Sequence, residues 1–247
     1  MNLQIDVGNT QTKWRVIEGD KVLHRGSQAT TTLAESELDL SSVSSLASAR
    51  LCSVAKPDIA QSIALQLAQQ FNVDLQVAKV SAVAGGVSCG YEQTQTLGVD
   101  RWLALVAAYQ QYQGAVLVID VGSAMTLDLV SPDGQHVGGY ILPGLQLMRE
   151  ALWLGTDRVR AAQDVEAVDA LNMLVPGACT GDAVNRGCLL AAVALVEKLA
   201  STYPAAVVIT GGDASTLLDA LSLKADHSSD LVLAGLSVVD IELVSAG

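Results

Sequence analysis

Short apolar runs alternate with longer amphipathic stretches along the chain, and this pattern predicts strands that alternate with helices. Residues 27–48 are rich in Ser, Thr and Ala, and we interpret them as variable surface structure. Alternating strands and helices imply a sheet that is covered on both faces. The predicted strands outside the repeat described next are 51–54, 75–80, 207–210 and 231–234, and the predicted helices are 58–71, 100–112, 145–154, 182–201 and 214–221.

The chain contains an internal repeat. Residues 5–12 (IDVGNTQT) line up with residues 119–126 (IDVGSAMT) at an offset of 114 residues, which is close to half the chain. Each copy follows a short apolar strand and leads into a second strand that ends at a tight turn. The turns, at 18–20 and 132–134, contain Gly and Asp, which supply the backbone angles of a hairpin. A third strand follows each turn (21–26 and 136–141), so each half is predicted to begin as a three-stranded meander.

Composition restricts the classes of protein that this chain can belong to. Of its 247 residues 50% are hydrophobic and 16% are charged, which allows a substantial core. The formal net charge of −12, without a run of Lys or Arg, argues against binding to nucleic acid or to an anionic membrane surface. The four cysteines form no C-x-x-C pair, so we expect small buried side chains in a reducing compartment. Without a secretory signal or a bilayer-length apolar run, the chain is expected to be cytoplasmic.

Each copy of the repeat contains an Asp-x-Gly turn, which suits phosphate binding. Glycine lets the backbone approach a phosphate and donate its N–H groups, and small polar side chains add donors. Asp6 and Asp120, at strand ends, are candidates for holding a metal ion. A single turn of this kind reads equally well as structural, but two copies in matching meanders favour function. The candidate phosphate-binding residues are Gly8, Asn9, Thr10, Lys13, Gly122 and Ser123.

A strand that breaks at paired glycines and restarts as a helix is predicted near residues 207–221. Gly211 and Gly212 would admit a flat purine or its ribose against the backbone, and the following helix N-terminus favours anions. The structural alternative is a plain strand-to-helix connection.

Asp100 stands at the expected start of a helix, next to Arg101. The structural alternative for Asp100 is an N-cap. The functional interpretation is a general base, with an arginine that offsets the charge of a transferring group or an anionic substrate. A carboxylate that stays ionised at a helix start suffices for phosphoryl transfer, because the loose transition state needs an oriented hydroxyl more than early deprotonation.

Other catalytic motifs are missing from the sequence or lack their context. There is no G-x-x-x-x-G-K-[ST] phosphate loop and no G-x-G-x-x-G dinucleotide fingerprint. Residues 86–90 (GVSCG) match the hydrolase pattern G-x-S-x-G, but polar residues rather than a helix follow them. His24, His136 and His227 are isolated, and we expect them to be structural or exposed.

The ordered set of segments IDVGNTQTKW, LGVDRW, VIDVGSAMTLD, GGYILPG, TGDAVNRG and ITGGDA resembles the type III pantothenate kinases across essentially the whole chain. The resemblance implies a fold of the actin-like ATPase and sugar-kinase superfamily, an α/β architecture in which a ribonuclease H-like domain is duplicated. We therefore expect two similar domains, residues 1–113 and 114–247, with a nucleotide cleft between them.

The same resemblance implies an activity and a set of site residues. The family phosphorylates pantothenate with ATP, the first step of coenzyme A synthesis, as a cytoplasmic homodimer that needs Mg²⁺ and a monovalent cation (K⁺ or NH₄⁺). Asp100 would be the catalytic base, residues 6–13 and 120–128 the two phosphate loops, and Asp120 would lie near the monovalent cation. Gly211 and Gly212 would lie against adenosine. The implied pantothenate contacts are Tyr91, Gly98, Val99, Asp100, Arg101 and Thr180.

The sequence departs from the family pattern at three positions. Ser123 keeps the hydroxyl of the usual Thr, Thr94 stands where Pro often precedes the L-G-x-D-R stretch and is expected to loosen that loop, and Met125 lies in the second loop. Two alternative functions remain at this stage. One is a nonenzymatic regulatory or accessory protein on the same scaffold. The other is a different small-molecule kinase of the superfamily.

Overall fold

The computed structural model describes residues 1–34, 36–55, 57–155 and 174–246. By its internal contacts the chain divides into two compact units. Unit 1 comprises Met1–Gln111, Gly134–His136 and Asp230–Gly247, and unit 2 comprises Tyr112–Asp133 and Val137–Ser229. The chain first passes into unit 2 close to the expected boundary, but two later segments return to unit 1. The division into residues 1–113 and 114–247 stays a prediction.

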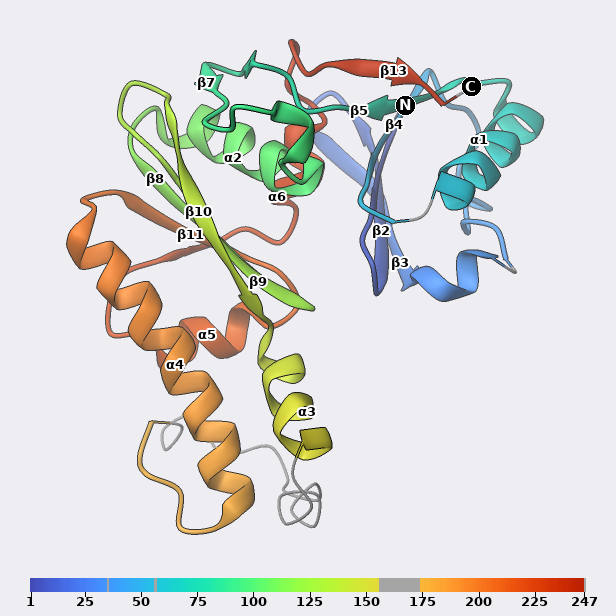
Figure 1. Cartoon of the computed structure of the whole chain (residues 1–247). Helices are drawn as coiled ribbons and strands as arrows, with labels where there is room; N and C mark the ends of the chain where they lie inside the picture. Colours follow the sequence, from blue (N-terminus) through green and yellow to red (C-terminus); the bar gives the residue numbers. More distant parts are fainter. Residues whose placement is uncertain (35, 56, 156–173, 247) are drawn as a thin grey trace. The chain divides into compact units, whose positions relative to one another are not determined.

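Unit 1 is built on a mixed sheet with the strand order β13-β5-β4-β1-β2-β3. Strands β1, β2 and β3 are antiparallel neighbours, which confirms the first predicted meander. The elements of this unit (Figure 1) are β1 (Asn2–Val7), β2 (Gln11–Glu18), β3 (Lys21–Ala29), η1 (Thr30–Ala34), β4 (Ser48–Ser53), α1 (Pro57–Phe71), β5 (Leu75–Ala78), β6 (Val83–Ala84), β7 (Val87–Ser88), η2 (Thr94–Thr96), α2 (Val99–Tyr112), α6 (Leu231–Gly235) and β13 (Leu243–Ser245).

Alternation along β1 separates a hydrophobic face of the sheet from a polar one. Leu3, Ile5 and Val7 are fully buried in a core to which α1 contributes Ile63 and Leu67. The residues between them, at positions 4 and 6, point to the opposite face because successive side chains of a strand alternate. The polar side chains of β1 therefore share the face on which α6 packs.

The stretch 27–48 lies at the surface, as its composition suggested, but four of its apolar side chains are buried. Its first residues extend β3 to Ala29, and its apolar side chains belong to the core of unit 1. The buried Gln66 of α1 holds this stretch in place, since its amide donates to the Leu38 carbonyl and accepts from the Leu38 N–H. Ser, Thr and Ala dominate the stretch, but four spaced apolar residues fix it to the sheet: Leu33, Leu38, Leu40 and Val43.

The strand predicted at 231–234 is wrong, because these residues form the helix α6. The apolar run is buried on all sides, and such a run has no period that separates a strand from a helix turn. Gly235 at its end packs so closely on α2 that an added Cβ would lie 2.4 Å from the Leu103 carbonyl oxygen. The helix is thus held between β1 and α2.

Unit 2 is built on a sheet with the strand order β10-β9-β8-β11-β12. The pairing of β8 with β9 and of β9 with β10 confirms the second predicted meander. The elements of this unit (Figure 1) are β8 (Val116–Val121), β9 (Ala124–Val130), β10 (His136–Pro143), α3 (Leu145–Gly155), α4 (Thr180–Thr202), β11 (Ala206–Thr210), α5 (Ala214–Ala220) and β12 (Asp226–His227).

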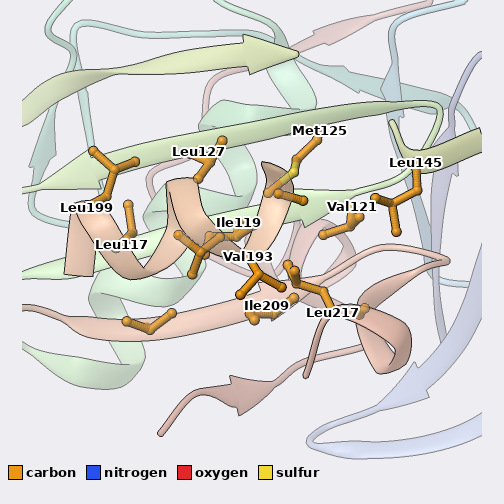
Figure 2. Packing of buried hydrophobic residues seen from close by; sticks show 14 of the residues in the cluster. Leu117, Ile119, Val121, Met125, Leu127, Leu145, Val193, Leu199, Ile209 and Leu217 are labelled. Carbon is orange, nitrogen blue, oxygen red and sulfur yellow. The ribbon is translucent and has the colours of Figure 1, made fainter. Parts of the chain in front are cut away.

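The core of unit 2 lies between one face of this sheet and its helices. Figure 2 shows Leu117, Ile119 and Val121 of β8 facing Val193 of α4 and Leu217 of α5. The other β8 positions, which include Asp120, point to the opposite face of the sheet. Asp120 therefore occupies the same position on β8 as Asp6 does on β1, next to the end of the strand and on the face opposite the core.

The two copies of the repeat differ by one residue in their hairpin loops. In unit 1 Val7 pairs with Thr12, whereas in unit 2 the equivalent Val121 pairs with Met125. The ungapped alignment is therefore shifted by one residue after the turn. Met125 does not lie in the loop but at a fully buried position of β9, where it packs in the core of unit 2 (Figure 2).

Candidate active site

The first Asp-x-Gly turn joins β1 to β2. The Gly8 N–H donates to the Gln11 carbonyl at 3.0 Å, and the Thr30 hydroxyl donates to the Gly8 carbonyl at 2.8 Å. The Thr30 N–H in turn donates to the Thr10 carbonyl at 2.9 Å. Asn9 and Thr10 at the tip are exposed. Neighbouring backbone thus holds the loop in shape, while its tip is accessible to a ligand.

Asp6 lies at the end of β1 beside a buried thiol. Cys52, its partner on β4, is fully buried. Burial raises the pKa of the Cys52 thiol well above its usual range, and the charges of Asp6 and Asp100 and a hydrogen bond to Asp6 raise it further. The thiol therefore stays protonated and donates to the Asp6 carboxylate. The charges of Asp6 on β1 and Asp100 on α2 both act on this thiol, and both residues belong to unit 1. Lys13 is the partner of Asp6 on β2 and is half-buried.

Asp100 occupies the first turn of α2, one residue after the helix begins at Val99. Its Oδ1 accepts the Arg101 N–H at 2.8 Å. The same oxygen lies over Gly98, where an added Cβ would approach it to 2.5 Å. The helix start and a glycine together fix the direction of this carboxylate.

Arg101 is directed toward Tyr91. Its Nη1 donates to the Tyr91 hydroxyl at 3.2 Å, and its guanidinium carbon lies 5.8 Å from the centre of the Tyr91 ring. Only 8% of Arg101 is exposed. A buried cation of this kind, with donors in a fixed plane, suits the binding of a carboxylate or phosphate.

The structure adds His136 to Tyr91 and Arg101. From the sequence, His136 was expected to be an isolated histidine. His136 is 1% exposed, and its ring stacks on Tyr91 with centroids 5.8 Å apart and planes 10° from parallel. His227, in contrast, is exposed. The sequence contains no signal for this contact, because the two residues are far apart in the chain and meet only through the packing of the second hairpin tip.

The second Asp-x-Gly turn, in unit 2, lies beside the paired glycines. Gly211 has a φ of +101°, and an added Cβ there would lie 2.5 Å from Asp120 Oδ1 and 2.4 Å from the Val121 carbonyl oxygen. The Asp213 N–H donates to that same carbonyl at 3.0 Å. The structure therefore brings the turn after β8 and the turn after β11 together, as expected for neighbouring parallel strands.

Two further glycines of unit 2 leave their backbone open. At Gly122 an added Cβ would meet its nearest protein atom at 3.7 Å, and at Gly212 no atom lies within 4 Å. Gly144, in contrast, is required by packing, because an added Cβ would lie 1.9 Å from the Gly122 carbonyl oxygen. Internal packing therefore requires glycine at position 144 but not at positions 122 and 212. Gly122 and Gly212 leave space next to the backbone that a ligand can occupy.

Comparison with known proteins decides the family. Residues 2–202 match the family model for type III pantothenate kinase. The chain is 41% identical over 246 residues to the type III pantothenate kinase of Ectopseudomonas mendocina, covering 96% of this chain and 98% of that one. It is 42% identical over 249 residues to that of Pseudomonas aeruginosa, with the same coverage. The chain belongs to the type III pantothenate kinase family. It is accordingly a phosphotransferase that phosphorylates pantothenate in coenzyme A biosynthesis.

Solved structures agree on the fold. A putative 2-dehydro-3-deoxygalactonokinase from Sinorhizobium meliloti matches 96% of this chain and 97% of its own length with a TM-score of 0.64 at 16% identity. A putative Baf family transcriptional activator from Campylobacter jejuni covers 94% of both chains with a TM-score of 0.58 at 20% identity. These likenesses concern the fold alone, which is that of the actin-like ATPases and sugar kinases, as the sequence predicted. The family match removes the nonenzymatic alternative.

Some residues implied by family membership stay predictions after the structure. Thr180 is the exposed first residue of α4 in unit 2, whereas Tyr91, Gly98 and Asp100 lie in unit 1. Thr94 begins the short helix η2, and its carbonyl accepts the Leu97 N–H at 3.0 Å, so a hydrogen-bonded turn forms here without proline.

Mg²⁺ and a monovalent cation, which the resemblance implied, stay predictions. Among the described residues no group of three or more His, Cys, Asp or Glu side chains could hold a metal ion. Asp6 in unit 1 and Asp120 in unit 2 would each suit a cation that takes a single protein carboxylate and completes its shell with phosphate oxygens and water, which is the usual manner of Mg²⁺. No helix in the described ranges is long and apolar enough to cross a membrane.

The remaining sequence motifs have structural explanations in this pantothenate kinase. Ser88 of the GVSCG segment lies in the short strand β7 and not at a strand-to-helix turn, as expected. None of the described cysteines forms a disulfide. Cys52 and Cys188 are buried, as predicted, but Cys179 is exposed and accepts the Asp182 N–H at the start of α4.

Proposed function

We propose that this chain transfers the γ-phosphoryl group of ATP to the hydroxyl of pantothenate, with Asp100 as the general base. The observation that supports this most is the fixed direction of the Asp100 carboxylate at the start of α2, where its Oδ1 accepts the Arg101 N–H at 2.8 Å. Asp100 and the first Asp-x-Gly turn belong to the same unit. Phosphoryl transfer depends mainly on positioning and charge stabilisation, and a fixed carboxylate meets that need.

Phosphate binding is assigned to both Asp-x-Gly turns. In unit 1 the N–H groups and side chains of Asn9 and Thr10, with Lys13, would contact the phosphates. In unit 2 Gly122 and Ser123 would do so, and Gly211 with Gly212 would lie against the adenosine. The open backbone at Gly122 and Gly212 supports these roles, since neither glycine is required by contacts inside the protein.

The acceptor is assigned to the residues around α2. Pantothenate carries a carboxylate, and the buried Arg101 is suited to bind it with its planar donors. Tyr91 and the Gly98–Val99 backbone would line the same site, and Thr180 is proposed to add a contact. Asp100 would accept the proton of the pantothenate hydroxyl as that oxygen attacks the γ-phosphorus.

Two cations are part of the proposal. Mg²⁺ would be held with the help of Asp6, and a monovalent cation (K⁺ or NH₄⁺) near Asp120. Bound Mg²⁺ would neutralise charge on the phosphates during transfer. The chain's own contribution is a carboxylate at each strand end, one hydrogen-bonded to Cys52 and one lying against the Gly211 backbone.

A homodimer is proposed on the apolar surface of unit 2. Strand β10 is the edge strand of its sheet, and it exposes large apolar side chains, as does the neighbouring helix α3. Contiguous exposed apolar residues on an edge strand favour association with another chain. A second copy of this chain is the occupant that family membership supports. The surface consists of Val137 (58% exposed), Tyr140 (51%), Ile141 (64%), Leu147 (48%), Leu152 (44%) and Leu154 (74%).

The activity is tested by incubating the purified protein with Mg·ATP, K⁺ and pantothenate and detecting phosphopantothenate by mass spectrometry. A panel of other small alcohols, followed by ADP release, separates pantothenate from alternative acceptors, and omission of K⁺ tests the monovalent cation. A folded protein that forms no phosphopantothenate would refute the proposal.

The role of Asp100 is tested by the substitution Asp100→Asn. The amide keeps the shape of the side chain but cannot accept the proton, so kcat is expected to fall about a hundred-fold or more while ATP binding persists. Asp58→Asn is the matched control, because Asp58 is an exposed acid in the first turn of α1 in the same unit. Near-normal kcat in Asp100→Asn would mean that this carboxylate only stabilises the helix start.

A further inference from the structure

We propose that His136 is a positioning residue of the acceptor site, which acts on Arg101 through the Tyr91 ring. The proposal rests on the proposed function only in assigning Tyr91 and Arg101 to pantothenate. It adds a residue from the second hairpin to a site otherwise assigned to residues 91–101 and Thr180.

The stacked rings form the first step of this chain of contacts. His136 is almost completely buried, and its ring lies nearly parallel to that of Tyr91, with 5.8 Å between centroids and 10° between planes. Offset parallel stacking of this kind is a favourable geometry for two aromatic rings and holds them in a fixed orientation. Tyr91 itself is only half-buried, so its ring depends on a neighbour for its orientation.

The second step runs from Tyr91 to the arginine. The Tyr91 hydroxyl accepts a hydrogen bond from Arg101 Nη1 at 3.2 Å. A tyrosine that rotates about its side-chain bonds would remove this acceptor, which is one of the contacts that hold the guanidinium in its plane. Because bidentate recognition of a carboxylate depends on that plane, the orientation of Tyr91 bears directly on acceptor affinity.

The backbone around His136 is anchored to the same segment that carries Tyr91. The His136 carbonyl oxygen lies so close to Gly90 that an added Cβ on Gly90 would be 2.0 Å from it. The Ser88 N–H donates to the Gly134 carbonyl at 2.8 Å. The hairpin tip 134–136 is therefore fixed to residues 88–91, and His136 is a fixed support on which the Tyr91 ring rests.

The proposal is tested with His136→Leu and His136→Phe. Leucine keeps most of the volume but removes the flat ring, so the KM for pantothenate should rise about three- to tenfold, the range that the loss of one aromatic pair implies. The KM for ATP should not change. Phenylalanine keeps the flat ring and should restore the pantothenate KM. His227→Leu, at an exposed histidine of β12, is the matched control and should behave like the unaltered protein.

A double-mutant cycle with Tyr91→Leu separates positioning from a general structural effect. If His136 acts through Tyr91, then His136→Leu should add little to the pantothenate KM of Tyr91→Leu, because contacting residues are not additive. Thermal unfolding of each variant verifies that the fold persists. Multiplicative effects on KM, or a pantothenate KM unchanged in His136→Leu, would overturn the proposal. An unaltered protein that makes no phosphopantothenate would instead refute the proposed function.

Discussion

At the scale of single residues, the position of the Asp100 carboxylate depends on Gly98, which has no side chain. Asp100 Oδ1 lies 2.5 Å from the position that a Cβ on Gly98 would occupy. That oxygen is at the far end of a flexible side chain, so a methyl group at position 98 would push the carboxylate aside and leave the backbone of α2 in place.

Gly98→Ala is therefore expected to lower kcat with little effect on stability. A displacement of the base by about 1 Å costs on the order of a hundred-fold in rate. Gly187→Ala is the matched control, since Gly187 lies within α4 and has no atom within 4 Å of an added Cβ. Steady-state kinetics and thermal unfolding measure the two effects separately. A large loss of stability with unchanged kcat would contradict the assigned role of Gly98.

What the sequence predicts at this scale depends on whether the partners are near in the chain. Asp6 and Asp100 were predictable because each sits in a local pattern, a strand-turn and a helix start. Cys52 and His136 were not, because Cys52 meets Asp6 across a pair of parallel strands and His136 meets Tyr91 from a distant hairpin tip. Only long-range register brings them to the site, and a single sequence does not contain that register.

At the scale of elements, the connection from β11 to α5 contains two adjacent glycines with different structural roles. Gly211 has a left-handed φ, and its Cα lies against the Val121 carbonyl, whereas Gly212 has no atom within 4 Å of an added Cβ. Gly211→Ala is expected to destabilise unit 2 by about 2 kcal/mol or more through backbone strain and the close contact. Gly212→Ala should leave stability unchanged and weaken ATP binding.

Urea unfolding and ATP titration compare the two variants directly. Each serves as the control for the other, because the same methyl group is added one residue apart. Equal stability of both variants would contradict the packing role of Gly211. Unchanged ATP affinity in Gly212→Ala would contradict its place against the nucleotide.

A polar network ties α6 to the polar face of the sheet of unit 1. The carboxylate before α6, Asp230, accepts from Arg15 at 3.3 Å and also from Arg25. Burial alone would raise the pKa of Asp230, but hydrogen bonds and charges from Arg25 and Arg15 outweigh it and hold this pKa below its usual value. Arg15 also donates to the buried Gln4 of β1 at 2.7 Å.

Asp230→Asn is expected to reduce the free energy of unfolding by about 1–2 kcal/mol at pH 7, since Arg25 is largely exposed and its share is screened. A carboxyl with a lowered folded-state pKa stabilises above its unfolded value of about 3.9, and that stabilisation is lost as the pH falls through the folded value. Denaturant unfolding from pH 7 to pH 2 should therefore show the two proteins converging in acid. A constant difference across this range would contradict the charge-based account.

Elements were predictable wherever turn chemistry or amphipathic period was clear. Both meanders and the major helices agree with the sequence because Gly and Asp turns separate them. Helix α6 was missed because a short apolar run that is almost completely buried has no period that distinguishes a helix from a strand. The one-residue shift at Met125 was missed because an ungapped alignment cannot detect a shorter hairpin loop.

At the scale of the whole molecule, the exposed apolar surface of unit 2 predicts association. Ile141→Lys places a charge on the edge strand and should convert a dimer of twice 25.6 kDa into a monomer, as measured by light scattering after size exclusion. Leu65→Lys, at an equally exposed leucine of α1, is the matched control and should stay dimeric. A dimer that persists in Ile141→Lys would exclude this surface.

The duplication was visible at this scale because the two Asp-x-Gly turns lie half a chain apart. The sequence does not show which residues belong to each unit. That depends on the β13 pairing with β5 and on the hairpin tip at 134–136, contacts between segments that share no local pattern.

The return of distant segments to unit 1 has a practical consequence for genetic dissection. A fragment that stops after residue 113 would contain Asp6 and Lys13 of the first phosphate loop and the proposed base Asp100. It would nevertheless lack α6 over β1, β13 along β5 and the histidine under Tyr91. Halves separated at the repeat boundary are therefore unsuited to complementation by simple mixing. A fragment that joins residues 1–111 to 230–247 by a linker restores α6 and β13, but it still lacks the hairpin tip 134–136 that belongs to the same unit.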